Sequence, residues 1–176
     1  MTRRLYLASA TGALSMVDRA SLTETPYPNL AAPYSGIVVN SATNRIYARG
    51  VNTNNIVIID GATNVATTST AFADTAANGF GLNPVTNTVY AVAGSSVPTL
   101  NVLDGATNDV HSVPISGAPE GLAINTLTNK IYVSDPNNGS VNVVEGEALA
   151  VTSVSAGAGA RAIGVNPITN RVYVVN

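Results

Sequence analysis

The 176-residue sequence contains no cysteine, no tryptophan and a single histidine, His111. Without cysteine it can form neither disulfides nor thiolate metal sites, and one histidine cannot supply the nitrogen cluster of a zinc site. Charged residues make up only 10% of the chain, well below the roughly 25% of an average soluble domain. Because few residues are charged and suited to contact with water, we expect most secondary-structure elements to be covered on both faces.

The charges that are present do not gather into a patch. Eight basic and ten acidic residues are scattered along the chain and give a net charge of −2. No basic run could release counterions from a phosphate backbone, so the sequence disfavours nucleic acid as a main partner.

No apolar run approaches the roughly 20 residues of a membrane-spanning helix. Arg3 and Arg4 precede an apolar stretch that is too broken for a good signal peptide.

A repeat of about 42 residues runs through the whole chain. Its clearest part has the pattern Asn-x-x-Thr-Asn-x-Ile/Val-Tyr and occurs at 40–47, 83–90, 125–132 and 166–173. A second part, Asp-Gly-Ala-Thr-Asn, keeps step with it at 60–64 and 104–108, and in degenerate form from Glu145. Residues 4–6 and 16–18 fit the same frame. Repeats of about 40–45 residues with short strands are typical of β-propeller blades.

Each unit predicts four short strands, A to D. In the fourth unit they fall at 121–124, 130–133, 140–144 and 150–154. These runs are rich in β-branched residues and broken by Asn, Asp, Gly and Pro, and no long segment shows helical periodicity. We therefore predict an all-β fold, a β-propeller of four-stranded antiparallel blades, in a single repeat domain. Blade equivalents cover 1–35, 36–78, 79–120 and 121–161, and residues 162–176 begin a further blade.

The most regular stretches are Asn166-Pro-Ile-Thr-Asn-Arg-Val-Tyr-Val-Val-Asn176 and the two Asp-Gly-Ala-Thr-Asn turns. In these stretches, and in register over essentially the whole chain, the sequence resembles the YVTN family of β-propeller repeats. The resemblance implies a propeller and, because that family includes surface-layer and cell-surface proteins, an extracellular or cell-surface location. The sequence departs from the family pattern at Asp18-Arg-Ala-Ser and Glu145-Gly-Glu-Ala, where we expect altered turns between strands C and D.

The repeated polar residues are predicted to be structural. They are the turn residues Asn40, Asn83, Asn125 and Asn166 between strands A and B, and Asp60, Gly61, Asp104 and Gly105 between strands C and D. Asn side chains in such turns bond nearby backbone amides, and we expect the glycines to supply a positive φ. Calcium binding is the alternative for the acidic residues. One carboxylate per blade cannot converge on an ion that needs about six to eight oxygens, so we predict no metal site.

The tyrosine of strand B also recurs in every unit. We expect these side chains to pack between blades with their hydroxyls hydrogen-bonded, rather than to form a binding ladder. The series consists of Tyr6, Tyr47, Tyr90, Tyr132 and Tyr173.

Ligand binding is expected on the face opposite the repeated turns. In an up-and-down blade the A–B and C–D turns share one face, and the more variable B–C and D–A loops share the other, where binding normally occurs. The residues just before each strand A lie nearest the ring axis, and we take them as candidate ligand-binding residues: Ser35, Asn78, Glu120 and Arg161. Glu120 and Arg161 form either a polar anchor at the mouth of the channel or a solvated pair at its rim.

The sequence offers little for catalysis. His111 falls in strand D, the outer strand, and the acidic residues of the variable face are Asp74, Glu120 and Asp135. No Gly-rich phosphate loop follows a strand and opens a helix. We therefore predict no catalytic residues, no cofactor and no enzyme activity for this chain alone.

The first and last strands, at 3–7 and 171–175, both occupy position B of the repeat. The chain therefore holds four blade equivalents and one surplus strand. An open array of blades would expose apolar faces and sheet edges. Four blades could close on themselves, two chains could complete an eight-bladed ring, or the chain could belong to a longer propeller, commonly of seven blades. We expect a homo-oligomer or a longer parent, closed by strand exchange between chain ends.

The leading functional hypothesis is a non-catalytic propeller that binds a protein or small molecule, or acts as a scaffold, at the cell surface or after secretion. One alternative is a propeller enzyme (a lyase, lactonase or quinone-dependent enzyme) whose site is completed by further blades or a partner chain. Another is a self-assembling filament or surface-layer subunit. A convergent cluster of histidine and acids near the axis would favour the enzyme, and open-ended polymers would favour the filament.

Overall fold

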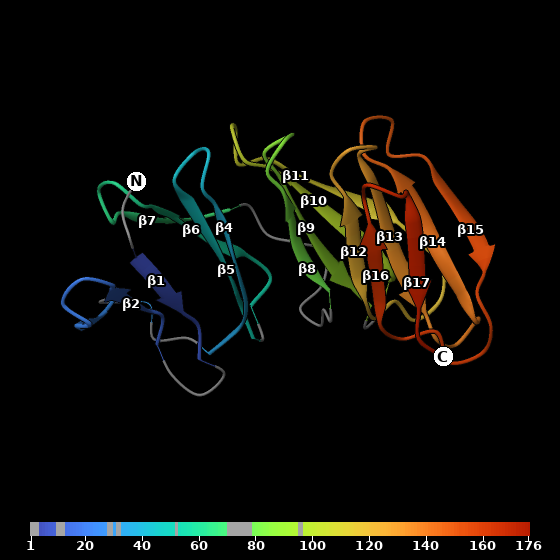
Figure 1. The fold of residues 1–176 in the computed structure, drawn as a ribbon, viewed down its shortest axis with the longest axis horizontal. Coiled ribbons are helices and arrows are strands. Elements are labelled where there is room, and N and C mark those ends of the chain that lie inside the picture. Colours follow the sequence, from blue (N-terminus) through green and yellow to red (C-terminus); the bar gives the residue numbers. More distant parts are fainter. Residues whose placement is uncertain are drawn as a thin grey trace. The chain divides into compact units, whose positions relative to one another are not determined.

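A computed structural model describes residues 4–9, 13–27, 30, 33–51, 53–69, 79–94 and 97–176. Every regular element in these ranges is a β-strand, and the strands form five antiparallel sheets (Figure 1). The predicted all-β fold built from four-stranded antiparallel blades is confirmed. The chain divides into two compact units, Met1–Ala71 and Phe72–Asn176. The extent of the predicted blade equivalents stays a prediction.

The first unit contains one sheet of three strands and one of four, each in chain order. The strands are β1 (Arg4–Leu7), β2 (Ser15–Asp18) and β3 (Glu24–Pro26), then β4 (Tyr34–Asn40), β5 (Arg45–Gly50), β6 (Ile56–Asp60) and β7 (Ala66–Thr68). Ile46 and Ile59 of the larger sheet are fully buried in one cluster with Tyr6 and Met16 of the smaller. The two sheets therefore share a core, as successive blades do.

The second unit contains two sheets of four strands and a final hairpin (Figure 1). The strands are β8 (Phe80–Asn83), β9 (Thr88–Ala93), β10 (Thr99–Asp104) and β11 (Val110–Pro114), then β12 (Leu122–Asn125), β13 (Lys130–Asp135), β14 (Ser140–Glu145) and β15 (Val151–Ser155), and last β16 (Ile163–Asn166) and β17 (Arg171–Val174). Tyr90 and Leu100 of the first sheet meet Ile131 and Val144 of the second in one buried cluster. Aliphatic side chains on facing sheets thus replace the large aromatics that the sequence lacks.

Side chains alternate along each strand and so face different neighbours. On β14, Val144 lies in the core shared with the preceding sheet, whereas Val141 and Val143 point to the other face. There they meet Val172 and Val174 of β17 across a groove. The β12–β15 sheet therefore has one face toward the sheet before it in the chain and one toward the hairpin after it.

Glycines on the innermost strands allow neighbouring sheets to approach closely. A Cβ at Gly81 on β8 would lie 2.8 Å from Leu122 Cδ2 and 2.9 Å from Ile124 Cδ1, both on β12. A Cβ at the equivalent Gly164 on β16 would meet no atom within 4 Å among the described residues. The glycine of β8 thus receives branched side chains from the next sheet, whereas the glycine of β16 does not.

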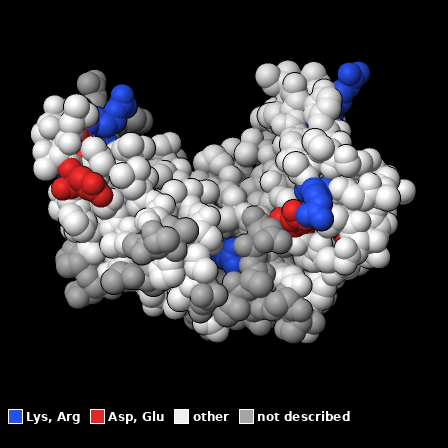
Figure 2. All heavy atoms as spheres, turned by 90° about the horizontal axis from the view of Figure 1, so that it is seen from below, with Lys and Arg blue, Asp and Glu red and all other residues white. Residues whose placement is uncertain are grey.

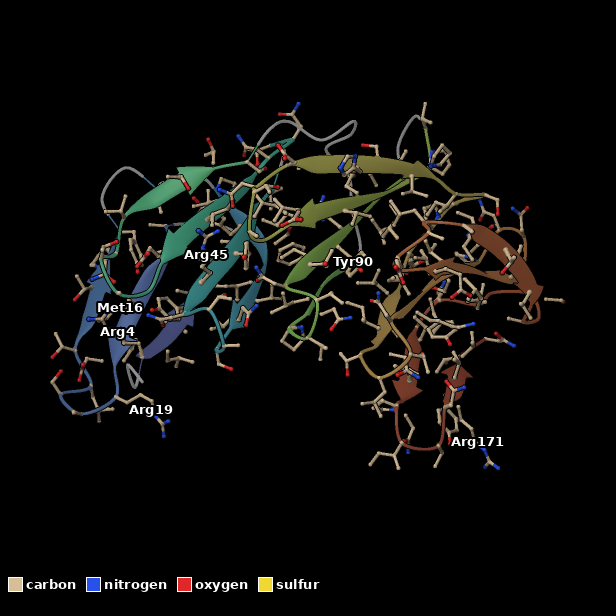
Figure 3. The ribbon with its side chains drawn as sticks, turned by 90° about the horizontal axis from the view of Figure 1, so that it is seen from above. Arg4, Met16, Arg19, Arg45, Tyr90 and Arg171 are labelled. Carbon is tan, nitrogen blue, oxygen red and sulfur yellow. The ribbon has the colours of Figure 1, made fainter. Side chains whose placement is uncertain are left out.

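The tyrosines of strand B are buried as predicted in some sheets but not in the final hairpin. Tyr47 and Tyr90 are fully buried and Tyr132 is 8% exposed, but Tyr173 is 57% exposed. Figure 3 shows Tyr90 pointing from β9 into the interior between sheets. The expectation that every hydroxyl is hydrogen-bonded is wrong for Tyr6, whose buried hydroxyl has no partner among the described residues. The rings pack as apolar bodies.

The turns between strands A and B are built on asparagine, and they join successive sheets. Asn125 Oδ1 accepts hydrogen bonds from the backbone amides of Leu127 (3.0 Å) and Thr128 (3.3 Å). Its Nδ2 donates to Oδ1 of Asn170 in the next turn (2.9 Å), and Asn83 donates in the same way to Asn129 (2.9 Å). These bonds form an asparagine ladder across the second unit.

In the turns between strands C and D the acidic side chain caps the backbone. Asp60 Oδ1 accepts from the amides of Ala62 (2.8 Å) and Thr63 (2.9 Å), and Asp104 caps its turn in the same way. The expected positive φ at Gly61 and Gly105 is wrong: the left-handed residues are Asn64 (φ 59°) and Asn108 (φ 68°), at the end of each turn.

Glycine is needed in these turns for a different reason. The Gly61 amide donates to the Asn44 carbonyl (2.8 Å), which brings the C–D turn against the A–B turn of the same sheet. A Cβ at Gly61 would lie 2.5 Å from Asn44 Oδ1 and 2.7 Å from the Asn44 carbonyl oxygen. Close approach of two backbones, not backbone handedness, selects glycine at this position.

Candidate functional site

The loops that enter the innermost strands meet the loops between the second and third strands at one end of the second unit. We call this end the loop face; it consists of residues 115–121, 136–139 and 156–162. The Ala156 amide donates to the Gly139 carbonyl (2.8 Å), and the Glu120 amide donates to the Ser134 carbonyl (2.9 Å). The opposite end, with the A–B and C–D turns, is the turn face.

Two predicted ligand-binding residues come together on the loop face. Arg161 Nη1 lies 3.1 Å from Glu120 Oε1 and 2.9 Å from Oε2. The side chains remain accessible, with exposed fractions of 67% for Arg161 and 33% for Glu120. Because the two residues precede the innermost strands of successive sheets, the repeat itself places them side by side. The pair therefore presents both charges to solvent and to any ligand.

Buried polar side chains hold the loop face in place. Asp135 is fully buried and accepts hydrogen bonds from the Ala118 amide (3.0 Å) and from Asn138 Nδ2 (2.7 Å). Asn142, 1% exposed, accepts from the Ser116 hydroxyl (2.8 Å). Ser134 Oγ accepts from the Gly121 amide (2.8 Å) and donates to the Arg161 carbonyl. These contacts join the loops of one sheet to strands of the next.

The other two candidate residues are not placed with this pair. Ser35 lies within β4 of the first unit and is exposed, rather than in the loop before the strand as predicted. The difference arises because Tyr34 already pairs with Gly50, and a register shift between Tyr34 and Gly36 leaves Ser35 bulged. Asn78 lies outside the described residues, as does Asp74.

Most described carboxylates already have structural partners. Asp18, Asp60 and Asp104 cap turns, and Asp135 holds a loop. Glu120 pairs with Arg161, and Glu145 pairs with Lys130 on the turn face (2.8 Å). Figure 2 shows few charged side chains among the described residues on the face in view. Few of the described carboxylates therefore lack a structural partner and could act in a reaction.

Two of the remaining acids, Asp109 and Glu147, line a groove together with the histidine, and the sequence reasoning missed this groove. It has a volume of about 410 Å³, lies at the turn face of the second unit, and is lined by residues that include Asp104, Asp109, His111 and Glu147. His111 is exposed on the outer strand β11, where the sequence placed it. Asp109 follows one C–D turn and Glu147 lies in the next, which was the only available signal. No three His, Cys, Asp or Glu residues in the described ranges could hold a metal ion.

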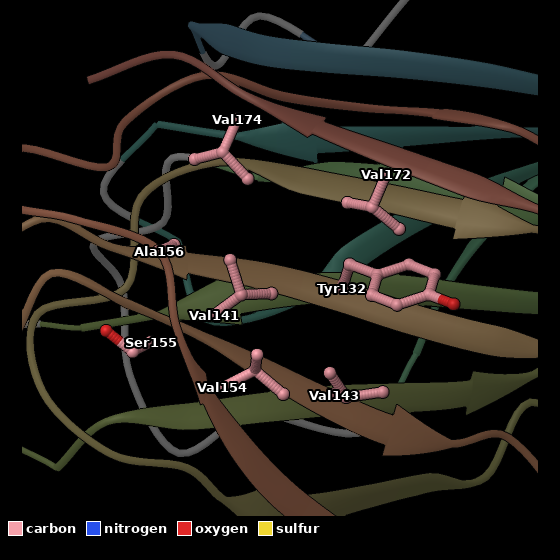
Figure 4. A pocket seen from close by; sticks show the side chains of 8 residues that line it. All are labelled: Tyr132, Val141, Val143, Val154, Ser155, Ala156, Val172 and Val174. Carbon is pink, nitrogen blue, oxygen red and sulfur yellow. The ribbon is translucent and has the colours of Figure 1, made fainter.

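A second groove is apolar. Tyr132, Val141, Val143 and Val154 of the β12–β15 sheet face the β16–β17 hairpin, as Figure 4 shows for the lining side chains. Its volume is about 410 Å³, and Val154 is 56% exposed. The hairpin covers the inner part of this sheet, since β16 lies against β12 and β13. The outer strands of the sheet are left open.

Local hydrogen bonds and burial shift several pKa values. Amides of Thr63 and Ala62 hold the pKa of Asp60 below its usual value of 3.8. Amides of Ser21 and Ala20 do the same for Asp18. Burial raises the pKa of Tyr90, while the nearby Thr88 and Thr86 side chains oppose that rise. None of these shifts creates a proton donor or acceptor active near neutral pH.

Among the described residues there is no helix of the length and apolarity required to traverse a bilayer. No model of a protein family matches the sequence, and no curated protein matches it either.

Solved structures do resemble the chain. A nidogen–laminin complex matches with a TM-score of 0.75 and 10% identity, over 100% of this chain and 68% of that one. Hydrazine synthase from Kuenenia stuttgartiensis matches with a TM-score of 0.71 and 13% identity, over 99% of this chain and 68% of that one. A streptogramin B lyase matches with a TM-score of 0.76 and 12% identity, over 98% of this chain and 58% of that one.

At these identities the likeness shows the fold alone. The propeller neighbours include a binding protein and an enzyme, so the fold does not choose between those roles. The antiparallel blades, their shared cores and these neighbours together establish that the chain has a β-propeller fold.

Proposed function

We propose that this chain is a non-catalytic binding module, a propeller of the YVTN type that engages its ligand through the loop face. The observation that carries the proposal is the structural use of its carboxylates. Asp60 and Asp104 cap turns, Asp135 holds a loop, and Glu120 is paired with Arg161. A catalytic acid or base needs a reacting group within hydrogen-bond reach, and these side chains are already engaged elsewhere.

The loop face supports binding because its loops are held by buried contacts. Asp135 and Asn142 bond the backbone or side chains of residues 116–118, so little order has to be gained when a ligand arrives. The Glu120–Arg161 pair supplies a donor and an acceptor side by side. We therefore expect ligands that carry both, such as peptides or sugars.

A location at the cell surface or outside the cell is part of the proposal. Its support is the likeness of the repeat to YVTN sequences. The single lysine, Lys130, and the loops rich in Thr, Asn and Ser are compatible with it.

Amide chemical shifts test the binding site. Isotope-labelled protein is titrated with short peptides and oligosaccharides, and we expect perturbed amides at 115–121, 136–139 and 156–162. The charge-neutral double variant Glu120→Ala/Arg161→Ala should weaken binding by about tenfold or more, equivalent to about 1.4 kcal/mol. The matched control Lys130→Ala/Glu145→Ala removes an exposed ion pair from the turn face and should leave affinity unchanged. Perturbations confined to the turn face would contradict the proposal.

An enzyme is the second candidate, and one observation favours it: the only histidine lines a groove with Asp104, Asp109 and Glu147. The test is turnover of lactone and ester substrates by the wild type and by His111→Ala. We expect no turnover above the uncatalysed rate. Turnover that His111→Ala abolishes would replace the binding module with a propeller enzyme.

A further inference from the structure

The three-stranded sheet of the first unit has no innermost strand among the described residues. The other sheets each begin with one, namely β4, β8, β12 and β16. Strand β1 holds the second position of the repeat, and its described pairing is with β2. Beside it lies a groove of about 500 Å³, whose lining includes Arg4, Tyr6, Val39, Ser41, Asn44 and Ala62. An innermost strand for this sheet belongs in that groove.

The floor of the groove is shaped to receive such a strand. Val39 on β4 is 47% exposed and lines the groove where the strand would run. Its repeat equivalent on β12, Ile124, instead packs on Gly81 of the preceding innermost strand. A strand with glycine at the repeat position of Gly81 would receive Val39 in the same way as Gly81 receives Ile124.

Strand β16 has the required features. Gly164 occupies the position of Gly81, and the described residues leave open space around it. Asn166, the next member of the asparagine ladder, is exposed, whereas Asn83 and Asn125 are buried and bonded to the following turn. The residue that would follow Asn166 in the ladder has the repeat position of Asn44, which lines the groove. Donor and groove thus match at two positions.

Strand β17, which now pairs with β16, can be replaced by β1 of a second copy without a change of register. Strands β17 and β1 occupy the same repeat position, with Tyr173 equivalent to Tyr6. Val165 pairs with Val172 in the hairpin, and Leu5 is the repeat equivalent of Val172. Exchange of β17 for β1 therefore replaces one set of backbone hydrogen bonds by an equivalent set.

Exchange also covers apolar surface that is otherwise open. Strands β2 and β3 would follow β1 across the apolar groove lined by Val141, Val143 and Val154. Leu5, 53% exposed on β1, would lie on the face that meets it. The same type of contact already joins the β8–β11 and β12–β15 sheets within this chain, so the new interface continues an existing one. Its apolar burial favours exchange over the hairpin.

We propose that two copies of this chain associate by strand exchange: β16 of one copy becomes the innermost strand of the β1–β3 sheet of a second, and β17 is displaced. The interface is head-to-tail, because each copy contributes a donor strand from one unit and a receiving sheet from the other. Such contacts close into a ring where the rotation permits and otherwise continue as a polymer.

Mass in solution, measured by sedimentation over a range of concentrations, tests the association. We expect a dimer or a larger species for the wild type. The double variant Val165→Cys/Val172→Cys should be monomeric when oxidised, because the disulfide fixes β17 on β16, and should associate when reduced. The absence of native cysteine leaves no competing thiol. A wild type that stays monomeric at every concentration would overturn the proposal, as would association of the oxidised variant.

Cross-linking between copies tests the register. Equal amounts of Val165→Cys and Leu5→Cys proteins are mixed and oxidised, and a disulfide-linked heterodimer should form. Leu127→Cys, placed at an exposed leucine of a turn (70%), is the control for Leu5→Cys and should not cross-link. A double variant Val165→Cys/Leu5→Cys that forms its disulfide only within one monomer would show closure of a chain on itself and would sink the two-copy proposal.

A bulky residue at Gly164 gives a second, independent test. Gly164→Val has space within the isolated copy, so circular dichroism should show an intact fold. In the exchanged assembly its side chain would collide with the branched residues of β4, and the variant should be monomeric. Association of Gly164→Val at the wild-type concentration dependence would contradict the proposed packing.

Discussion

The tyrosine of the second strand has very different surroundings from sheet to sheet. Tyr90 is fully buried between two sheets, whereas Tyr173 is 57% exposed at the equivalent position. We expect Tyr90→Ala to lower the free energy of unfolding by about 3–5 kcal/mol, the usual cost of emptying a large buried aromatic site. Tyr173→Ala should cost less than about 1 kcal/mol in the isolated copy. Urea unfolding curves measure both, and a loss below about 1 kcal/mol at Tyr90 would mean that the ring is not packed as described.

The C–D turn requires glycine because a larger residue would not fit against the neighbouring A–B turn. At Gly61 a methyl group would press on Asn44, so we expect Gly61→Ala to destabilise the fold by about 1 kcal/mol or more. Gly164→Ala is the matched control, because its Cβ meets nothing within 4 Å. In the isolated copy that substitution should be neutral or stabilise by about 0.4–1 kcal/mol through the unfolded chain. Equal losses of thermal stability at the two sites would contradict the steric explanation.

Acid should weaken the capped turns. The pKa of Asp60 is lowered in the fold by hydrogen bonds from the Thr63 and Ala62 amides. Its ionised form therefore contributes stability above the ordinary value of 3.8, and that contribution is lost as the pH falls through the lowered pKa. Asp60→Asn retains the acceptor oxygen but does not titrate, so stability should fall less steeply below about pH 4. Unfolding midpoints measured across this range check the slope, and identical slopes would exclude a role for the charge.

At the scale of elements, an asparagine of the ladder can stabilise the fold in two ways: it caps its own turn, and it donates a hydrogen bond to the next turn. Asn125 and Asn166 both cap their own turns, but only Asn125 donates to the following turn among the described residues. Asn125→Ala should therefore cost about 0.5–1.5 kcal/mol more than Asn166→Ala, the usual net contribution of one hydrogen bond. Chemical denaturation of the two variants measures the difference. Equal costs would mean that the ladder bond adds nothing beyond the turn.

The strands could be predicted because period, β-branched runs and turn residues all agree on them. The predictions that failed concerned the backbone conformation of single residues. Ser35 lies in a bulge within β4 because Tyr34 pairs with Gly50. No pattern in the neighbouring sequence predicts that pairing. The left-handed backbone at Asn64 was misassigned to Gly61, because both residues tolerate turns and only the docking of two turns distinguishes them.

The candidate site was predictable to the same extent. The repeat placed Glu120 and Arg161 one period apart before successive innermost strands, and they do form a pair. The supporting roles of Asp135 and Asn142 could not be foreseen, since burial of a polar residue depends on partners from another sheet. The groove around His111 was missed because it depends on how the C–D turns of two successive sheets pack against each other.

At the scale of the whole molecule, the blade-like sheets and the solved structures that the chain resembles establish propeller architecture. The matched structures extend beyond this chain, which spans 58% of the streptogramin B lyase chain and 68% of the nidogen complex chain. The strand-exchange proposal gives the open groove of the first unit an occupant from a second copy. In Figure 3, Arg171 projects away from the hairpin whose strands would exchange.

The ladder also sets the order in which the second unit should come apart. The described rungs, Asn83–Asn129 and Asn125–Asn170, tie the β12–β15 sheet on both sides, whereas they tie the β16–β17 hairpin on one side only. Amide protons of β16 and β17, at the exposed end, should therefore exchange with solvent fastest, and those of β9, β10 and β13 slowest. Opening would then travel backward along the repeats, one blade at a time.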